Sequence, residues 1–159
     1  MKFSSQEEYG LRCLLRIARD GHEKGLTIPE ISQAEGITAA NTAKLLRILR
    51  LGGFVGSSRG QIGGYSLARP ADKILVGDVL NVLGGKLFDE QFCDTHTGIQ
   101  QICTNTIDCS IRSLWQTLQK AVDGVLSRLT IKDLIASEEA IVSRIALLNK
   151  ETAANLTTN

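Results

Sequence analysis

The residues best suited to chemistry are three cysteines, Cys93, Cys103 and Cys109, which lie within seventeen residues of the chain. Thiolates are soft ligands that favour zinc, copper(I) or iron–sulfur clusters. In a reducing compartment, clustered thiols are more often metal ligands or redox centres than structural disulfides. The segment is therefore predicted to hold a metal centre or a redox switch. Cys13, the fourth cysteine, falls among apolar residues of a predicted helix, which indicates a core position.

The spacing of the three cysteines leaves several chemistries open. Nine residues separate Cys93 from Cys103 and five separate Cys103 from Cys109, unlike the two-residue spacing of zinc fingers. Three thiolates on a long loop match an iron–sulfur cluster that takes one more ligand from elsewhere. His96 would instead complete a Cys₃His zinc site. A reversible disulfide, or three plain buried cysteines, are the remaining interpretations.

The N-terminal part of the chain is predicted to form a helix-turn-helix. The periodicity of its apolar residues and its capping residues predict three helices: 4–19, a short helix from Thr27 to Gly36, and a helix capped by Thr38 that ends at Leu51. Two helices joined by a tight turn at residues 36–37 have the outline of a DNA-binding helix-turn-helix.

A β-hairpin is predicted directly after these helices. Residues 54–58 and 65–68 have the composition of short strands, and the Gly-rich segment 59–64 lies between them. This order is that of a winged helix, with Arg59 placed to enter a groove or meet a phosphate. An ordinary β-turn with an incidental arginine is the simpler alternative.

The C-terminal part is predicted to be helical around the cysteine segment. The expected divisions are a winged-helix domain (1–84), a cysteine-bearing loop (85–109), a region of dimerisation and further helices (110–150) and a frayed tail (151–159). A fourth helix is expected over 76–83. A long helix is expected over 110–129, where apolar residues recur at intervals of three and four residues. This spacing resembles a coiled-coil seam and predicts a homodimer. The fold class is therefore mainly α, with a small hairpin wing and a long dimerisation helix.

Positive charge is concentrated in the predicted DNA-binding region. Residues 36–73 contain six basic residues and one acidic residue, whereas residues 76–159 contain seven basic and ten acidic residues. A local excess of this kind favours phosphate contact, although a solvated helix face would also explain it. The residues predicted to meet DNA are Thr38, Ala40, Asn41, Thr42, Lys44, Arg47, Arg50, Ser58, Arg59, Gly60 and Gln61.

Other classes of protein find little support in the sequence. No apolar run approaches the roughly 20 residues that span a bilayer, and the N-terminus lacks the apolar core of a signal peptide, so the expected location is the cytoplasm. There is no phosphate-binding loop, no G-x-S-x-G elbow and no H-E-x-x-H pair, and His22 lies in a predicted loop. We expect no enzyme activity.

Four stretches of the chain resemble one family of bacterial regulators. They are MKFSSQEEYGLRCLL, ITAANTAKLLRILRLGGFV, the wing SSRGQIGGYSLARP and VGDVLNVLGG. Together they resemble the Rrf-two family of winged-helix transcription regulators over roughly residues 1–135, and the cysteines fall where its iron–sulfur branch (IscR-, NsrR- and RirA-like members) carries them. The resemblance implies a homodimer on DNA, a recognition helix over 38–51, Arg59 at the minor groove, and a cluster bound by the three cysteines.

The resemblance also bears on the fourth ligand. Arg112 stands where IscR-like members carry a ligating histidine, and Ala43 replaces the glutamate that tunes their choice of DNA site. In the NsrR-like branch an acidic residue on the first helix of the partner subunit is the ligand, and Glu8 occupies the matching position. A solvated helix N-terminus is the simpler explanation for Glu8.

The predicted function is a dimeric regulator that binds a palindromic operator in double-stranded DNA and senses cluster status, redox state or nitric oxide. The cofactor is a 2Fe–2S or 4Fe–4S cluster. Two alternatives remain: a winged-helix protein-interaction module with structural zinc, and a DNA-binding regulator that senses through a thiol–disulfide switch without metal.

Overall fold

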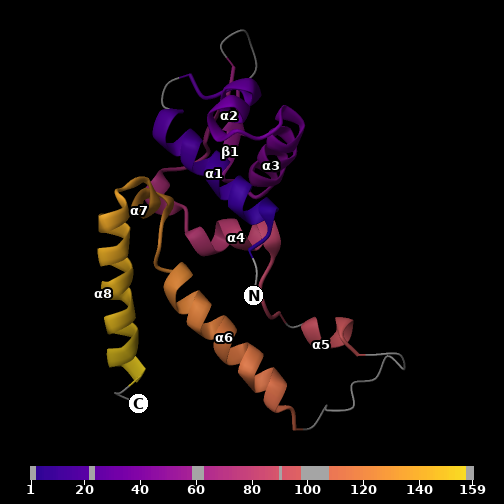
Figure 1. Cartoon of the computed structure of the whole chain (residues 1–159), viewed down its shortest axis with the longest axis vertical. Helices are drawn as coiled ribbons and strands as arrows, with labels where there is room; N and C mark the ends of the chain where they lie inside the picture. The colour runs from indigo at the N-terminus through magenta and orange to yellow at the C-terminus, as the bar shows by residue number, and fades with distance from the viewer. Residues whose placement is uncertain (1–2, 22–23, 59–62, 90, 98–107, 157–159) are drawn as a thin grey trace.

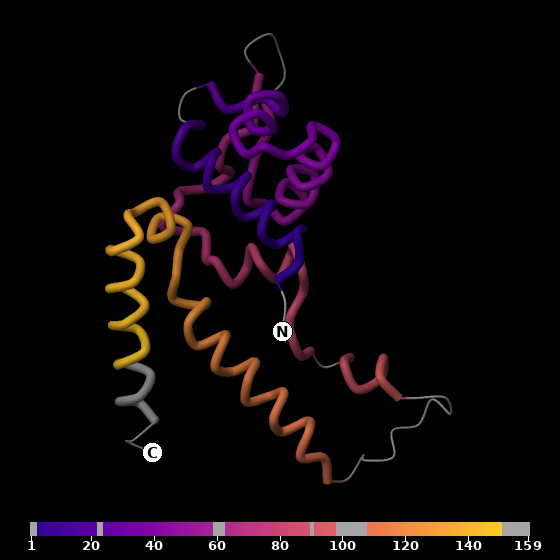
Figure 2. Tube along the Cα trace, in the orientation of Figure 1, coloured from indigo at the N-terminus to yellow at the C-terminus, as the bar shows by residue number. Residues whose placement is uncertain are grey.

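The computed structural model describes residues 3–21, 24–58, 63–89, 91–97 and 108–156 of the 159-residue chain. A compact head contains the N-terminal helices and a two-stranded hairpin, and two long helices extend from it (Figure 1). The N-terminus lies beside the head, and the C-terminal helix ends far from it (Figure 2). This mainly helical fold with a small antiparallel hairpin confirms the predicted fold class.

Three helices form the head, and each begins at the kind of capping residue expected. They are α1 (Ser5–Asp20), α2 (Ile28–Glu35) and α3 (Ala39–Leu51). The side chains of Ser4, Thr27 and Thr38 accept hydrogen bonds from backbone N–H groups in the first turn of their helices, which those turns cannot pair internally. Gly36 ends α2 in the left-handed conformation, φ 67°, which glycine adopts without strain. The predicted helix-turn-helix is therefore present.

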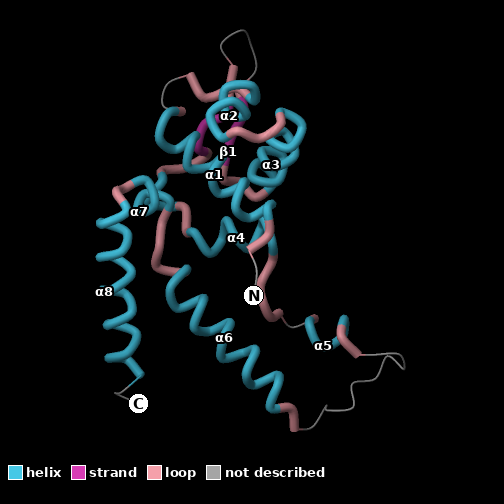
Figure 3. Tube along the Cα trace, in the orientation of Figure 1, coloured by secondary structure: helices cyan, strands magenta, loops and turns pink. Residues whose placement is uncertain are grey.

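The hairpin follows α3 directly. Strands β1 (Val55–Ser57) and β2 (Tyr65–Leu67) pair antiparallel, with Val55 opposite Leu67 and Ser57 opposite Tyr65 (Figure 3). Both strands are shorter than predicted. Two N–H···O bonds also join Leu26 and Tyr65, so the segment before α2 pairs with the wing. A 3₁₀ turn, η1 (Ala71–Lys73), then leads to α4 (Val76–Gly84).

One apolar core joins the head to the base of the long helices. It is built from fully buried side chains of α1, α2, α3, α4, α7 and the first strand: Leu14, Ile17, Ile31, Leu45, Leu46, Leu49, Phe54, Val55, Val79, Leu83 and Ile131. Cys13 is part of this core, as predicted, with no exposed surface. Burial, together with nearby Glu35, raises the pKa of its thiol to about 11.

The C-terminal part contains two short and two long helices after the cysteine segment begins. They are α5 (Phe92–Thr95), α6 (Ser110–Leu126), α7 (Ile131–Ile135) and α8 (Glu138–Leu156). The prediction that α6 runs to Leu129 is wrong. The Leu129 carbonyl accepts a hydrogen bond from the Val76 N–H at 2.8 Å, so the chain leaves the helix to pair with the start of α4. At the other end α8 continues through 151–156, where a frayed tail was predicted. No helix in the described residues is long and apolar enough to cross a membrane.

The apolar stripe of α6 divides into two halves. Val122, Val125 and Leu126 are half-buried near α4. Ile111, Leu114, Trp115 and Leu118, in the other half, remain 40–56% exposed. A groove of about 590 Å³ between α4 and α6 begins at Leu118, so the exposed apolar face and the groove are continuous. Exposed leucine, isoleucine and tryptophan at helical spacing are typical of a surface that another protein covers.

Candidate nucleic-acid interface and cysteine segment

Helix α3 presents short side chains in its first turn and basic side chains along the rest of its length at the surface of the head. Thr38 and Ala40 are exposed, Asn41 is half-buried, and Lys44, Arg47 and Arg50 are all exposed. These residues lie on the side of α3 opposite Leu45 and Leu49, which pack into the core. Their exposure fits a helix that enters a major groove, although contact with DNA is still a prediction.

Thr42 corrects one expectation. It was predicted to meet DNA, but it is completely buried, and its hydroxyl donates to the Thr38 carbonyl of its own helix at 3.1 Å. Leu46 is buried beside it, so the inner face of α3 is wider than the stripe of Leu45 and Leu49 indicated. The error has a simple cause: threonine tolerates burial when its hydroxyl is satisfied by the preceding turn. The Thr42 side chain therefore packs into the core and is not exposed for the DNA contact that the sequence predicted.

The base of the wing is held by backbone contacts. The Gly64 N–H donates to the Ser58 hydroxyl at 3.2 Å, and the Ser58 N–H donates to the Gly64 carbonyl at 3.1 Å. A Cβ at Gly64 would lie 2.8 Å from the Gly25 carbonyl carbon, so only glycine permits this approach between the wing and the segment before α2. Ser58 is exposed and thus has a structural role in addition to its predicted DNA contact. Arg59, Gly60 and Gln61 lie outside the described residues.

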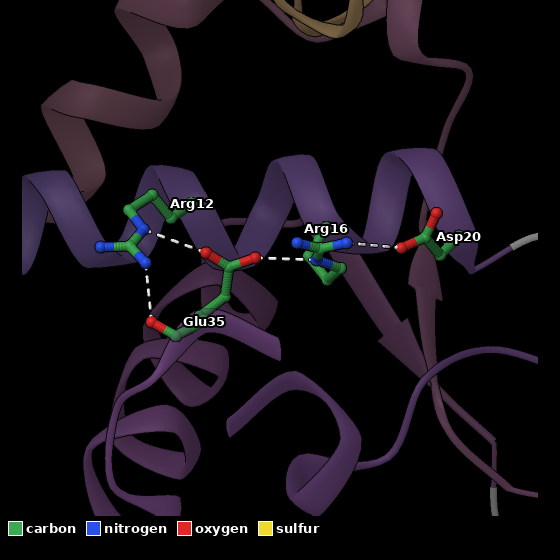
Figure 4. Close-up of polar contacts among 4 residues, drawn as sticks. All are labelled: Arg12, Arg16, Asp20 and Glu35. Atoms are coloured by element: carbon green, nitrogen blue, oxygen red, sulfur yellow. Dashed lines mark hydrogen bonds and ion pairs between the residues drawn. The ribbon is translucent and has the colours of Figure 1, made fainter. Parts of the chain in front are cut away.

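Two arginines of α1 hold the end of α2, a contact that the sequence analysis missed. Glu35 is the last residue of α2, and its carboxylate accepts from Arg12 Nε at 3.0 Å and from Arg16 Nε at 2.8 Å (Figure 4). Arg12 also donates to the Glu35 carbonyl at 2.6 Å. Arg16 reaches Asp20 at 2.9 Å as well. We call Arg12, Arg16 and Glu35 the arginine clamp.

The clamp fixes the turn that precedes α3. Its carboxylate is only 9% exposed, whereas the Arg12 and Arg16 side chains are 40% and 33% exposed. Hydrogen bonds that Arg16 donates to Glu35, and then to Asp20, raise the pKa of the Arg16 guanidinium, so Arg16 stays charged. The i, i+4 spacing of the two arginines on α1 was the available signal, since it places both on one helix face.

The cysteine segment places two described thiols outside the core. Cys93 lies in α5 and Cys109 caps α6. Both are half-exposed, whereas Cys13 is buried, and none of these three cysteines forms a disulfide bond. The Arg112 N–H donates to Cys109 Sγ at 3.3 Å. Cys103 lies outside the described residues. Within those residues no three His, Cys, Asp or Glu side chains converge to hold a metal ion. The donor chemistry of two accessible thiols nonetheless fits a soft metal or an iron–sulfur cluster.

The cysteine segment, residues 85–109, is attached to α6 near both of its ends. Cys109 begins that helix, and the Phe88 N–H donates to Gln119 Oε1 at 3.0 Å on the same helix. Gln119 is buried, and its amide N–H donates in turn to Asp123 at 2.8 Å. A buried glutamine with both ends of its amide paired is an uncommon and specific connection. In the sequence, the only sign of this role of Gln119 is its position within the otherwise apolar stripe of α6.

The two candidates for a fourth ligand sit in different surroundings. Glu8 is exposed in the first turn of α1, where a negative charge stabilises the helix. The structure does not bring it to either described thiol of its own chain. His96 follows α5, and its ring stacks on Phe92 with centroids 4.1 Å apart. His22 lies outside the described residues.

Comparisons with known proteins agree with this geometry. The Rrf2 family model, described as an iron-dependent transcriptional regulator, matches residues 3–137. The chain is 36% identical to protein rrf2 of Nitratidesulfovibrio vulgaris over 85% of its own length and 87% of that protein. Among solved structures, IscR of T. potens has a TM-score of 0.66 at 28% identity, covering 85% of this chain and 86% of that one.

A second similar structure is that of a regulator with a different description. CymR, the global cysteine regulator of B. subtilis, has a TM-score of 0.64 at 27% identity, covering 85% of this chain and 96% of that one. The description of the family as transcriptional regulators agrees with the prediction that the chain is a regulator and not an enzyme. The match of a family model to most of the chain, together with the helix-turn-helix and wing described above, shows that this protein belongs to the Rrf2 family of winged-helix transcriptional regulators.

Proposed function

We propose that this regulator is a homodimer whose affinity for a palindromic operator changes with the state of an iron–sulfur cluster held by Cys93, Cys103 and Cys109. The observation that carries the proposal is the attachment of both ends of the cysteine segment to α6, whose apolar face is exposed. A change at the cysteines would thus act on the helix that offers the dimer contact.

The proposed DNA contact uses the head. Thr38, Ala40 and Asn41 begin α3 and would approach base edges, and Lys44, Arg47 and Arg50 would contact phosphates. The wing residues Ser58, Arg59, Gly60 and Gln61 would lie at the flanking minor groove. Because the operator is DNA, a cytoplasmic location is part of this proposal.

The proposed dimer contact uses the exposed half of α6. Ile111, Leu114, Trp115 and Leu118 form an apolar strip along about two turns of the helix, which its own chain leaves open. A second copy of α6 would cover this strip and reach the groove beside α4. Two heads related by a two-fold axis would then match a palindromic operator.

The cluster is the part of the proposal that depends on donor chemistry. Cys93 and Cys109 supply accessible thiols at the two ends of the segment, and Cys103 supplies a third from the sequence between them. A bound cluster would supply a group whose oxidation, nitrosylation or loss changes the number of bonds to these thiolates.

A chain of contacts leads from the cysteine segment to the recognition helix. The Gln6 amide donates to the Leu83 carbonyl near the end of α4, immediately before the segment. Gly10 of α1 packs directly against the Leu83 side chain. Further along α1, Arg12 and Arg16 of the arginine clamp hold the turn before α3. A shift of α4 would therefore move α1 and, through Glu35, the reading head.

A thiol–disulfide switch is the second candidate. It is favoured by the similarity to the cysteine regulator CymR and by two half-exposed free thiols, Cys93 and Cys109. Membership in a family of transcriptional regulators gives no support to the zinc-bound interaction module that binds no DNA.

Anaerobic purification tests the cluster directly. The wild-type protein should be coloured and contain iron and acid-labile sulfide in equal amounts, and Cys103→Ala should be colourless. Cys13→Ala is the matched control, because that thiol is buried in the core and should leave the colour unchanged. Colourless, iron-free wild-type protein would contradict cluster sensing and favour the thiol switch.

A further inference from the structure

We propose that Asn41 determines which DNA sequence is bound, and that its side-chain amide pairs with the major-groove edge of an adenine in each half of the operator. The inference rests on the proposed contact between α3 and DNA. It goes further than that contact, because it names the base that the first turn of α3 recognises and the residue that recognises it.

The first observation is the set of hydrogen-bonding groups that the first two turns of α3 leave available. The Thr38 hydroxyl accepts from the Asn41 backbone N–H as the cap of the helix. The Thr42 hydroxyl is buried and donates to the Thr38 carbonyl. The side-chain amide of Asn41, in contrast, has no hydrogen-bond partner in the part of the chain that the structure describes. Its donor and its acceptor are both available to a ligand.

The second observation is that this amide matches adenine. In the major groove adenine presents an acceptor, N7, and a donor, the N6 amino group, and an asparagine amide pairs with both at once. Lys44 only donates hydrogen bonds, so it cannot make this pair of contacts. Cytosine is bound by carboxylates, and α3 contains no acidic residue. Among the side chains of these two turns, Asn41 is therefore the one that suits a two-bond contact with adenine.

The third observation is that the residues next to Asn41 allow close approach to the bases. Ala39 and Ala40 are exposed, and their side chains are single methyl groups. Asparagine is itself short, so it reaches a base edge only where no longer side chain beside it holds the helix away from the groove. The N-terminal residues of a recognition helix are those that contact base edges, and all three residues lie in the first turn of α3.

The fourth observation is that this turn is ordered before DNA binds. The Asn41 N–H donates to Thr38 Oγ1 at 3.3 Å, and the Thr42 N–H donates to the Thr38 carbonyl at 2.9 Å. Asn41 is also half-buried, which restricts the rotamers that its side chain can adopt. A group that is held in place in the free protein loses less conformational entropy on binding. The amide of Asn41 can therefore discriminate between bases and need not adapt to each of them.

Replacement of single atoms in the DNA tests this assignment. A duplex is selected from a random library with the wild-type protein, and each adenine of one half-site is replaced in turn by 7-deazaadenine, which lacks N7 but still pairs with thymine. Replacement of one of these adenines should weaken binding severalfold. A change of that A·T pair to G·C should weaken binding by about 5–150-fold. Asn41→Ala should bind more weakly than wild type and respond to neither change.

Two further variants separate base recognition from other losses. Arg50→Ala removes an exposed cation in the last turn of α3, and should weaken binding to all sequences alike while it keeps the response to 7-deazaadenine. Asn41→Asp keeps the size of the side chain and suits the first turn of a helix, so the fold is retained. It should lose the preference for adenine and favour cytosine at that position, because a carboxylate accepts from cytosine N4. Urea unfolding should show that each variant is folded.

The possible results separate this inference from the proposed function. If the wild-type protein bound no duplex from the library, the DNA contact and this assignment would be overturned together. If no adenine responded to replacement, the assignment of Asn41 would be overturned and the DNA contact would stand. The same conclusion would follow if Asn41→Asp still responded at the same adenine as wild type, or if Asn41→Ala lost affinity equally for A·T and G·C at that position.

Discussion

Replacement of Glu35 by glutamine should destabilise the head and misplace the recognition helix. The substitution keeps the shape of the side chain but removes the charge that Arg12 and Arg16 share. The amide NH₂ group would face a guanidinium, where neither group accepts a hydrogen bond. Glu35→Gln therefore isolates the charge of the arginine clamp from its packing.

The size of the effect follows from the exposure of the partners. A hydrogen bond to a charged group contributes about 1.5–3 kcal/mol when it is buried. The carboxylate is 9% exposed, but the arginines are 40% and 33% exposed, and solvent screens such pairs strongly. We therefore expect a total loss of about 1–2 kcal/mol, which lowers Tm by roughly 2–8 °C in a domain of this size.

The matched control changes the other carboxylate on Arg16. Asp20→Asn removes an exposed i, i+4 pair with a side chain that is 49% exposed, and should cost less than about 0.5 kcal/mol. Urea unfolding gives the stability of each variant, and fluorescence anisotropy on a duplex selected from a random library gives its DNA affinity. Glu35→Gln should weaken DNA binding several-fold, and Asp20→Asn should not. Equal and small losses in both variants would refute the role of the clamp.

Four further predictions follow from particular contacts. Lys44→Ala should weaken DNA binding and reduce the salt dependence of log affinity by about one unit, whereas Thr42→Ala should lower stability and leave that slope unchanged. Gly10→Ala places a Cβ 2.4 Å from Leu83 Cδ2 and should cost roughly 1–3 kcal/mol in urea unfolding; a gain in stability would contradict the close packing of α1 on α4. At pH 8 a thiol reagent should modify Cys93 and Cys109 rapidly in the cluster-free protein and spare Cys13. Because the folded pKa of Cys13 is raised to about 11, its stabilising contribution is complete below the unfolded thiol pKa of about 8.5 and is lost as the pH rises towards 11; Cys13→Ala should flatten this alkaline loss. Gln119→Leu should speed hydrogen exchange at the Phe88 amide, and unchanged exchange would exclude the attachment of the cysteine segment to α6.

The parts of the fold that local signals determine could be predicted from the sequence. Thr27 and Thr38 mark helix starts because their hydroxyls satisfy backbone N–H groups within one turn. Thr130 and Asp133 form a capping box at the start of α7 for the same reason. The hairpin followed from its glycines and from the order of elements.

Long-range contacts could not be predicted from such signals. The end of α6 depends on the pairing of Leu129 with Val76, which are more than fifty residues apart, so helical periodicity alone extended the helix too far. The burial of Thr42 depends on the width of the core beneath α3. Glu35 carries no local sign that two arginines of another helix reach it, and the pairing of Gln119 with Phe88 spans 31 residues.

The candidate site could likewise be predicted from the sequence only in part. The exposure of Lys44, Arg47 and Arg50 agrees with the predicted reading face, because their helical spacing relative to buried leucines determines it. The hydrogen bond and the ring stacking between His96 and Phe92, in contrast, are contacts that only the fold reveals.

The central claim is that the state of the cysteine segment controls DNA affinity. The most direct measurement is a pair of anisotropy titrations on one selected duplex, at one salt concentration, with a single anaerobic preparation before and after its iron is removed by a chelator. Coupling free energies between two sites correspond to about 5–150-fold changes in affinity, and we predict a difference within this range. Identical affinities in the two titrations, with iron loss confirmed by assay, would contradict the account.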